Sequence, residues 1–315
     1  KVMVRFKTIM ENDMDNLAEL IALDNGKTVA DAQGSIQRGI DVIEYATSLP
    51  KVLKEESSEV SPGIICTMTH APLGVVAGIT PFNFPVMVPL WMIPLAITTG
   101  NCFIFKPSEQ TPLAGLKIAE YLKEAGLPTG VFSVVNGSRE AVEGICDHSH
   151  ISAVAFVGSS QVAKIVYTRS TAAGKRALCL GGAKNHIIVV PDADENSTTK
   201  GLLASSMGSA GQRCMAASVA IGVADIDPII DQLIAETESF QLGEDMGTIV
   251  SKQALERITN YINEAVAMGA ELLVDGRNIT PPTEYRDGYW LGPTILDGVD
   301  PDWPCAKEEI FGPVL

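Results

Sequence analysis

Apolar runs of strand length alternate with helical segments in the middle of this chain, and this alternation restricts the fold more than any other feature. Five such runs lie between residues 75 and 180. Buried strands that alternate with helices are typical of a parallel sheet covered on both faces. The runs are residues 75–79, 102–105, 131–135, 153–157 and 178–180. The sequence therefore predicts an α/β fold.

A second domain is predicted after the fifth run, because the strand–helix pattern restarts there. We predict one domain over residues 1–182 and another over residues 183–315. In the first, helices are expected at 10–24, 36–49 and 112–125, and residues 57–70 are expected to form a strand or hairpin outside the core. In the second, strands are expected at 187–190, 216–223 and 272–274, and helices at 195–209, 227–238 and 252–268.

The composition argues against several classes of function. The 315 residues carry a net charge of −15, spread along the chain, so nucleic acid is an unfavourable partner. The four histidines and six cysteines show no metal-binding spacing and no C-x-x-C pair, so we expect reduced thiols and no metal site. Residues 71–105 lack charge, but five prolines interrupt them, and each costs about 3 kcal/mol inside a helix. A buried strand, a turn and a core helix explain this stretch better than a membrane span.

One cysteine, Cys214, lies in a setting that suits chemistry. Small residues crowd the segment 204–211 before it, and Arg213 precedes it directly. A nearby guanidinium favours the thiolate over the thiol and can also hold a substrate carboxylate. A buried structural thiol beside a surface arginine is the alternative, and the pair alone does not decide between the two.

Polar motifs follow three of the predicted strands, at the edge where open parallel sheets bind ligands. Asn83 can donate to a developing oxyanion, although turn chemistry alone accounts for it. Lys106 and Glu109 can contact an adenine ribose or a phosphate, or can form a plain surface ion pair. Residues 156–159 lead into a helix whose first amides can receive a pyrophosphate, but no G-x-G-x-x-G is present.

Read together, five motifs resemble those of the aldehyde dehydrogenase superfamily, in order and over essentially the whole chain. They are PFNFP at 81–85, KPSEQTP at 106–112, FVGS at 156–159, GQRC at 211–214 and EEIFGP at 308–313. The resemblance implies the aldehyde dehydrogenase fold, with a Rossmann-like NAD-binding domain over 1–182 and an oligomerisation arm over 57–71. It also implies an α/β catalytic domain over 183–315, whose C-terminal part lies beyond residue 315.

The resemblance further implies roles for individual residues. Cys214 is expected to be the nucleophile that attacks an aldehyde, and Asn83 is expected to hold the oxyanion together with the Cys214 amide. The expected NAD contacts are Thr80, Phe82, Lys106, Glu109, Gln110, Ser159, Gly181 and, at the nicotinamide ribose, Glu309. Because the Glu109 carboxylate repels a 2′-phosphate, we expect NAD rather than NADP.

One departure from the family pattern narrows the expected activity. Where hydrolytic members carry a glutamate base before Leu-Gly-Gly, this chain has Cys179, and a thiol is a poor base near neutral pH. This feature resembles the CoA-acylating branch, whose members oxidise methylmalonate or malonate semialdehyde, release CO2 and form propionyl- or acetyl-CoA. Arg38 and Arg213 match the two arginines with which that branch binds the substrate carboxylate. A hydrolytic dehydrogenase and an inactive remnant are the alternatives.

The expected partners also follow from the resemblance. They are the semialdehyde, NAD, CoA and further copies of the chain in a homodimer or homotetramer, with the segment 57–71 as the contact arm. Neither nucleic acid nor a membrane is expected. The expected location is the mitochondrial matrix or the bacterial cytoplasm.

Overall fold

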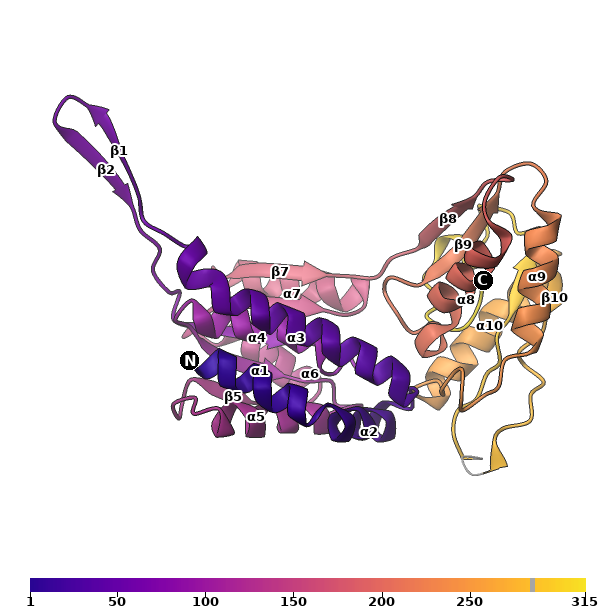
Figure 1. Ribbon diagram of the computed structural model, residues 1–315, viewed down its shortest axis with the longest axis horizontal. Helices are drawn as coiled ribbons and strands as arrows, with labels where there is room; N and C mark the ends of the chain where they lie inside the picture. The colour runs from indigo at the N-terminus through magenta and orange to yellow at the C-terminus, as the bar shows by residue number, and fades with distance from the viewer. Residues whose placement is uncertain (284–286) are drawn as a thin grey trace. The chain divides into compact units, whose positions relative to one another are not determined.

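The computed structural model describes residues 1–283 and 287–315 and divides into two compact units (Figure 1). Unit 1 comprises Lys1–Asp24 and Ala32–Gly181, and unit 2 comprises Asn25–Asp31 and Gly182–Leu315. The chain therefore enters unit 2 early, returns to unit 1, and enters unit 2 again after Gly181. The sequence prediction did not separate residues 25–31 from the first domain.

Unit 1 is built on a five-stranded parallel sheet, which confirms the predicted α/β fold. The strands are ordered β5-β4-β3-β6-β7 across the sheet. This is the 3-2-1-4-5 order of doubly wound dinucleotide-binding folds, which bind ligands where the strand order reverses, here between β3 and β6. The strands are β3 (Val75–Ile79), β4 (Cys102–Lys106), β5 (Phe132–Val134), β6 (Ile151–Val157) and β7 (Arg176–Leu180).

Helices cover both faces of this sheet. On one face, α1 to α5 form a core with Phe103 and Phe105 of β4. On the other, α6 and α7 pack against Val154 and Phe156 of β6. The helices are α1 (Val2–Asn12), α2 (Met14–Asn25), α3 (Val29–Val52), α4 (Met87–Thr98), α5 (Leu113–Glu124), α6 (Arg139–Asp147) and α7 (Ser160–Ala172). Helix α6 was not predicted, because its nine residues bury only Ile145 and Cys146, too few to establish a period.

The uncharged stretch 71–105 forms strand, turn, core helix and strand, as predicted. Helix α4 starts after Pro85, and Pro89 falls in its first turn, where a missing amide costs no helical hydrogen bond. Pro94 lies inside the helix, which is 12 residues long. None of the described helices is long and apolar enough to cross a membrane.

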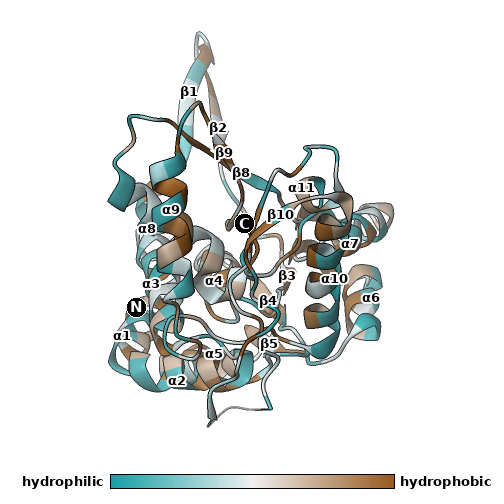
Figure 2. Ribbon diagram, turned by 90° about the vertical axis from the view of Figure 1, so that its right-hand side faces the viewer, coloured by the Kyte–Doolittle hydropathy of each residue, from teal (hydrophilic) through white to brown (hydrophobic). Residues whose placement is uncertain are grey.

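An antiparallel hairpin between α3 and β3 extends away from the rest of unit 1 (Figure 1). Strand β1 (Glu56–Ser61) pairs with β2 (Ile64–Met68), and every residue of both strands is exposed. The exposed side chains include Val60, Ile64 and Ile65, and Figure 2 shows hydrophobic residues near the tip. The predicted hairpin outside the core is confirmed.

Unit 2 combines two small sheets with a helical core. Strand β8 (Asn185–Val189) runs parallel to β9 (Ala217–Gly222), and β10 (Glu271–Val274) runs antiparallel to β11 (Ile295–Asp297). The helices are α8 (Glu195–Met207), α9 (Asp227–Glu238), α10 (Lys252–Met268) and α11 (Pro304–Lys307), and a short 3-10 turn, η1 (Gly208–Gly211), follows α8. Helix α10 buries Ile258, Ile262 and Ala265 at helical spacing and exposes its polar residues (Figure 2).

Candidate active site

The predicted oxyanion and cofactor residues after β3 and β4 lie at one edge of the unit 1 sheet. The register places Ile79 beside Lys106, and the Thr80 amide donates to the Lys106 carbonyl at 3.1 Å. The Thr111 hydroxyl donates to the Phe82 carbonyl at 3.2 Å, which holds the PFNFP turn against the loop after β4. Asn83, in the middle of this turn, is buried.

Lys106 and Glu109 form an ion pair across this edge. Lys106 Nζ lies 2.8 Å from Glu109 Oε2, and the lysine side chain is only 4% exposed, whereas the glutamate is 55% exposed. Burial alone would raise the pKa of the Glu109 carboxyl, but the Lys106 ammonium and a backbone amide hold it below its usual value. An exposed, ionised carboxylate backed by a buried cation can accept ribose hydroxyls. Gln110 follows with an exposed side chain.

The loops after β6 and β7 complete the edge. Ser159 is exposed at the N-cap position of α7, and the Gly158 amide donates to the Leu180 carbonyl at 3.1 Å, which brings Gly181 beside this loop. Among the described residues, the buried Thr80 hydroxyl has no hydrogen-bond partner. An unpartnered hydroxyl and the first amides of a helix, together at the edge of a doubly wound sheet, fit a dinucleotide.

Two further predicted residues of unit 1 lie in different surroundings. Arg38 lies in α3 with an exposed side chain, and none of the described contacts joins it to the sheet edge. Cys179, near the end of β7, is half-buried and packs against the apolar cluster that contains Cys146 and Phe156. Burial raises the pKa of the Cys179 thiol, so this group is a neutral thiol at physiological pH.

In unit 2, Cys214 follows a backbone turn of unusual conformation. Ser209, Ala210 and Gly211 all have left-handed backbones, with φ of 52°, 54° and 65°. Such a conformation costs roughly 1 to 2 kcal/mol for a residue with a β-carbon. The surrounding contacts must therefore hold the turn in place.

Those contacts come from distant parts of unit 2. Asp31 Oδ2 accepts the Ser209 amide at 2.9 Å. The buried Gln212 side chain donates to the Thr248 carbonyl at 3.0 Å and accepts the Val250 amide at 3.0 Å. Asn185 Nδ2 donates to the carbonyls of Cys214 and Ala216 at 2.9 and 3.0 Å. The backbone at Gly211 also packs closely against the backbone at Gly312, since a β-carbon on Gly211 would lie 2.0 Å from the Gly312 oxygen.

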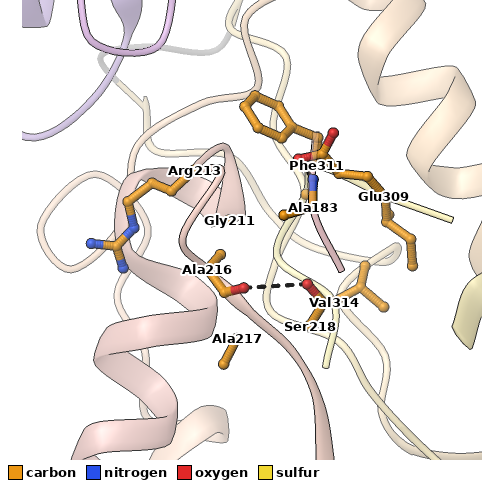
Figure 3. A pocket seen from close by; sticks show the side chains of 11 residues that line it. Ala183, Gly211, Arg213, Ala216, Ala217, Ser218, Glu309, Phe311 and Val314 are labelled. Atoms are coloured by element: carbon orange, nitrogen blue, oxygen red, sulfur yellow. Dashed lines mark hydrogen bonds between the residues drawn. The ribbon is translucent and has the colours of Figure 1, made fainter. Parts of the chain in front are cut away.

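Arg213 faces the end of α8. Its Nη2 donates to the Ala204 carbonyl and, at 3.1 Å, to the Ser205 carbonyl. A cation at this position stabilises the carbonyl end of a helix. Figure 3 shows the guanidinium extending toward α8, on the other side of a small pocket from Glu309. The pocket is lined by Ala183, Gly211, Arg213, Ala216, Ala217, Ser218, Glu309, Ile310, Phe311, Gly312 and Val314.

Glu309, in the EEIFGP motif, contacts the backbone of Gly182 and Ala183. Its Oε1 accepts the Ala183 amide at 3.4 Å, and a β-carbon on Gly182 would lie 2.1 Å from Oε2. Burial raises the pKa of the Glu309 carboxyl, against the opposing effect of the Ala183 amide and of the Arg257 and Lys184 charges. A side chain at residue 182 would therefore displace this carboxylate.

The environment of Cys214 disfavours the thiolate. Burial raises the pKa of the Cys214 thiol, and the Glu309 carboxylate raises it further, while the backbone amides of Cys214 and Met215 oppose this rise. The Arg213 guanidinium contacts the end of α8, and an effect of its charge on the Cys214 thiol stays a prediction. The structure brings Cys214, Arg213 and Glu309 together within unit 2.

The residues that support the turn could not be predicted from the sequence. Asp31 and the buried Lys27 lie in the segment 25–31, which the sequence marks only as a break between two helices. Gly26 signals a turn there, but nothing in the segment indicates a partner so far along the chain. Arg257, whose Nη1 donates to the Ile310 carbonyl at 2.6 Å, was also missed, because it reads as an ordinary helix residue.

Comparison with known proteins places these residues in a family. The model of the aldehyde dehydrogenase family matches residues 1–315. Two curated relatives cover the whole chain at 46% identity. One is a malonate-semialdehyde dehydrogenase of Pseudomonas aeruginosa, matched over 65% of its length, and the other is an acylating mitochondrial methylmalonate-semialdehyde dehydrogenase of Arabidopsis thaliana, matched over 53%.

A solved structure gives the same result. A protein of Sinorhizobium meliloti, provisionally named a methylmalonate-semialdehyde dehydrogenase and solved with NAD, superposes with a TM-score of 0.98 at 44% identity, over 100% of this chain and 66% of that one. The chain thus spans between about half and two thirds of the length of these relatives. The chain belongs to the aldehyde dehydrogenase family.

Proposed function

We propose that the full-length protein is an NAD-dependent, CoA-acylating dehydrogenase of malonate or methylmalonate semialdehyde. The two curated relatives carry these names, and the Arabidopsis protein is called acylating. The observation that carries the proposal is Cys179, a half-buried thiol of raised pKa where hydrolytic members of the family have a glutamate base. Without that base, water is a poor acceptor for the acyl group.

Cys214 is the proposed nucleophile. Its Sγ, once deprotonated, attacks the aldehyde carbon, and the new oxyanion accepts hydrogen bonds from the Asn83 side chain and the Cys214 amide. Bound NAD supplies the hydride acceptor for the oxidation, which leaves the acyl group on Cys214 as a thioester. The proposed NAD contacts are Thr80, Phe82, Lys106, Glu109, Gln110, Ser159, Gly181 and Glu309.

CoA then takes the acyl group. The CoA thiolate attacks the thioester carbon, a CoA thioester forms, and Cys214 leaves as a thiolate that regains its proton. The substrate carboxylate departs as CO2, and a proton replaces it on carbon. Arg38 and Arg213 are the proposed contacts of that carboxylate before it leaves. Arg213 can serve both α8 and the substrate, because a guanidinium has five N–H donors.

Product analysis tests the proposal. The purified full-length protein should form NADH from malonate semialdehyde at a steady rate only when CoA is present, and acetyl-CoA should accumulate. Cys214→Ser should abolish both, while Cys66→Ser, on the exposed hairpin, should leave them unchanged. Equal steady-state rates with and without CoA, or a free acid as the main product, would contradict the proposal.

A substitution at Cys179 tests the role of that position directly. Cys179→Glu places a carboxylate base where hydrolytic members have one, so free acid should form without CoA and the ratio of free acid to acyl-CoA should rise at least about tenfold. Cys179→Ser, which supplies no base, is the matched control. An unchanged product ratio in Cys179→Glu would show that water access is limited by something other than this residue.

The exposed hairpin supports a homo-oligomer. Val60, Ile64 and Ile65 project from strands with no core of their own, and a monomer gains nothing from exposing them. We propose that the hairpin, β1 and β2, contacts a second copy of the protein in a homodimer or homotetramer. A mitochondrial matrix or bacterial cytoplasmic location stays a proposal based on the family.

A further inference from the structure

The segment 25–31 is built into unit 2 by close backbone contacts. The Gly26 carbonyl accepts the Thr248 amide at 2.9 Å, and a β-carbon on Gly247 would lie 2.0 Å from the Gly26 oxygen. Lys27 is 4% exposed. The segment comprises the last residue of α2, the link 26–28 and the first turn of α3, and these contacts give it a structural role within unit 2.

Asp31 is the residue of this segment that contacts the cysteine turn. Its Oδ2 accepts the amide of Ser209, the first of the three left-handed residues. If α8 continued, that amide would donate to the Ser205 carbonyl, but this carbonyl accepts Arg213 Nη2 instead. Asp31 therefore supplies the acceptor that the helix no longer provides, and it does so with a charged oxygen, which makes the stronger kind of hydrogen bond.

A buried cation, Lys27, interacts with Asp31 and with Arg213. Burial lowers the pKa of Lys27 to about 8; Asp31 opposes this effect and the Arg213 charge adds to it. Lys27 thus interacts with Asp31 and with the arginine next to the nucleophile. The Asp31 carboxylate therefore does two things: it accepts the Ser209 amide, and it partly compensates the positive charge of Lys27.

The left-handed turn at 209–211 lies shortly before the nucleophile. Gln212, directly after the left-handed residues, is anchored to residues 248 and 250, and the next amides, of Cys214 and Met215, interact with the Cys214 sulfur. We propose that Asp31 is a positioning residue for Cys214: by holding the Ser209 amide it fixes the left-handed turn, and with it the approach of the sulfur to the aldehyde. This inference rests on the nucleophilic role of Cys214 in the proposed function.

Alkylation of Cys214 in the full-length protein tests the proposal. The rate constant for iodoacetamide at Cys214 would be measured from pH 6 to 10, with the modified residue located by peptide mass spectrometry. Asp31→Ala removes the acceptor, and the rate should fall about tenfold or more, as expected for the loss of one charge-assisted hydrogen bond. Asp31→Asn keeps an acceptor oxygen in the same place, so its rate should stay within about threefold of the wild-type rate.

Asp194→Ala is the matched control. Asp194 also accepts a backbone amide, that of Ser197 at 2.8 Å, but it lies at the start of α8, away from the cysteine turn. It should lower the unfolding midpoint without changing the alkylation rate or its pH profile. An unchanged rate in Asp31→Ala, or an equal loss in Asp194→Ala, would overturn the positioning role.

Asp31→Glu keeps the proposal testable if Asp31→Ala does not fold. Glutamate retains the charge but moves the carboxylate by one methylene, so it should slow alkylation more than asparagine does. The opposite order would mean that charge rather than position matters, and would overturn the proposal. Because alkylation needs neither semialdehyde nor CoA, its outcome is distinct from a failure of the proposed reaction.

Discussion

The sheet edge of unit 1 and the cysteine turn of unit 2 are assembled in different ways. The proposed cofactor residues of unit 1 lie at the end of β4 or in the loops that follow β3, β4, β6 and β7, and the strand order brings these loops together. The cysteine turn draws its contacts from Asp31, Asn185, Thr248, Val250 and Gly312. We therefore expect substitutions at the sheet edge to change ligand affinity separately, and substitutions around the turn to change stability and reactivity together.

The largest expected effect in this comparison is at Gly211. Gly211→Ala adds a β-carbon at a φ of 65°, 2.0 Å from the Gly312 oxygen, so the turn and the EEIFGP loop must separate. Gly298 has the same backbone conformation, a φ of 64°, but open space around its β-carbon position. We expect Gly298→Ala to lower the free energy of unfolding by about 1 kcal/mol and Gly211→Ala by about 3 kcal/mol or more. Urea denaturation of the full-length variants measures both, and equal losses would mean that the close approach is unimportant.

A smaller effect is expected at the sheet edge. Lys106→Met removes the buried cation that pairs with Glu109, and NAD should bind about tenfold more weakly, which corresponds to about 1.4 kcal/mol. The alkylation rate of Cys214 should not change. Lys117→Met, which removes an α5 ammonium that pairs with Glu120 at 3.2 Å, is the control for loss of a lysine in unit 1. Titration calorimetry with NAD gives the affinities. A changed alkylation rate of Cys214 in Lys106→Met would contradict the expectation that the two regions respond independently to substitution.

The smallest effect concerns the pH profile of the nucleophile. The Glu309 carboxylate contributes to the raised pKa of the Cys214 thiol, so Glu309→Gln should lower this pKa and shift the alkylation profile toward lower pH. At pH 7 the thiolate fraction, and therefore the rate, should rise roughly two- to threefold. Glu308→Gln, whose neighbour is Tyr261 rather than the cysteine, is the control. A shift toward higher pH would contradict the electrostatic account of this site.

The two regions also differ in how much of them the sequence predicts. Val75–Ile79 and Cys102–Lys106 are apolar runs followed by polar motifs, so the parallel sheet and the residues at its edge can be predicted from local patterns. The hydrogen bond from Ser209 to Asp31 leaves no such trace, because it joins residues 178 positions apart without a shared motif. The direction of Arg213 was also hidden, since helix α8 offers its carbonyls only once the chain has turned back on it. Local sequence patterns indicate which residues can take part in catalysis or binding. Long-range hydrogen bonds determine the orientation of their side chains, and these bonds leave no local pattern.

The early segment in unit 2 has a consequence for how the protein folds. The chain passes between the units after Asp24, after Asp31 and after Gly181, so Asp31 is synthesised long before Ser209. Contacts between residues so far apart form late, because closing a long loop has an entropic cost that local contacts do not have. The strands of unit 1 need no such closure with unit 2. A nascent chain should therefore complete the parallel sheet of unit 1 before Cys214 reaches its final position. The alkylation rate of Cys214 should then reach its native value only in the last stage of folding.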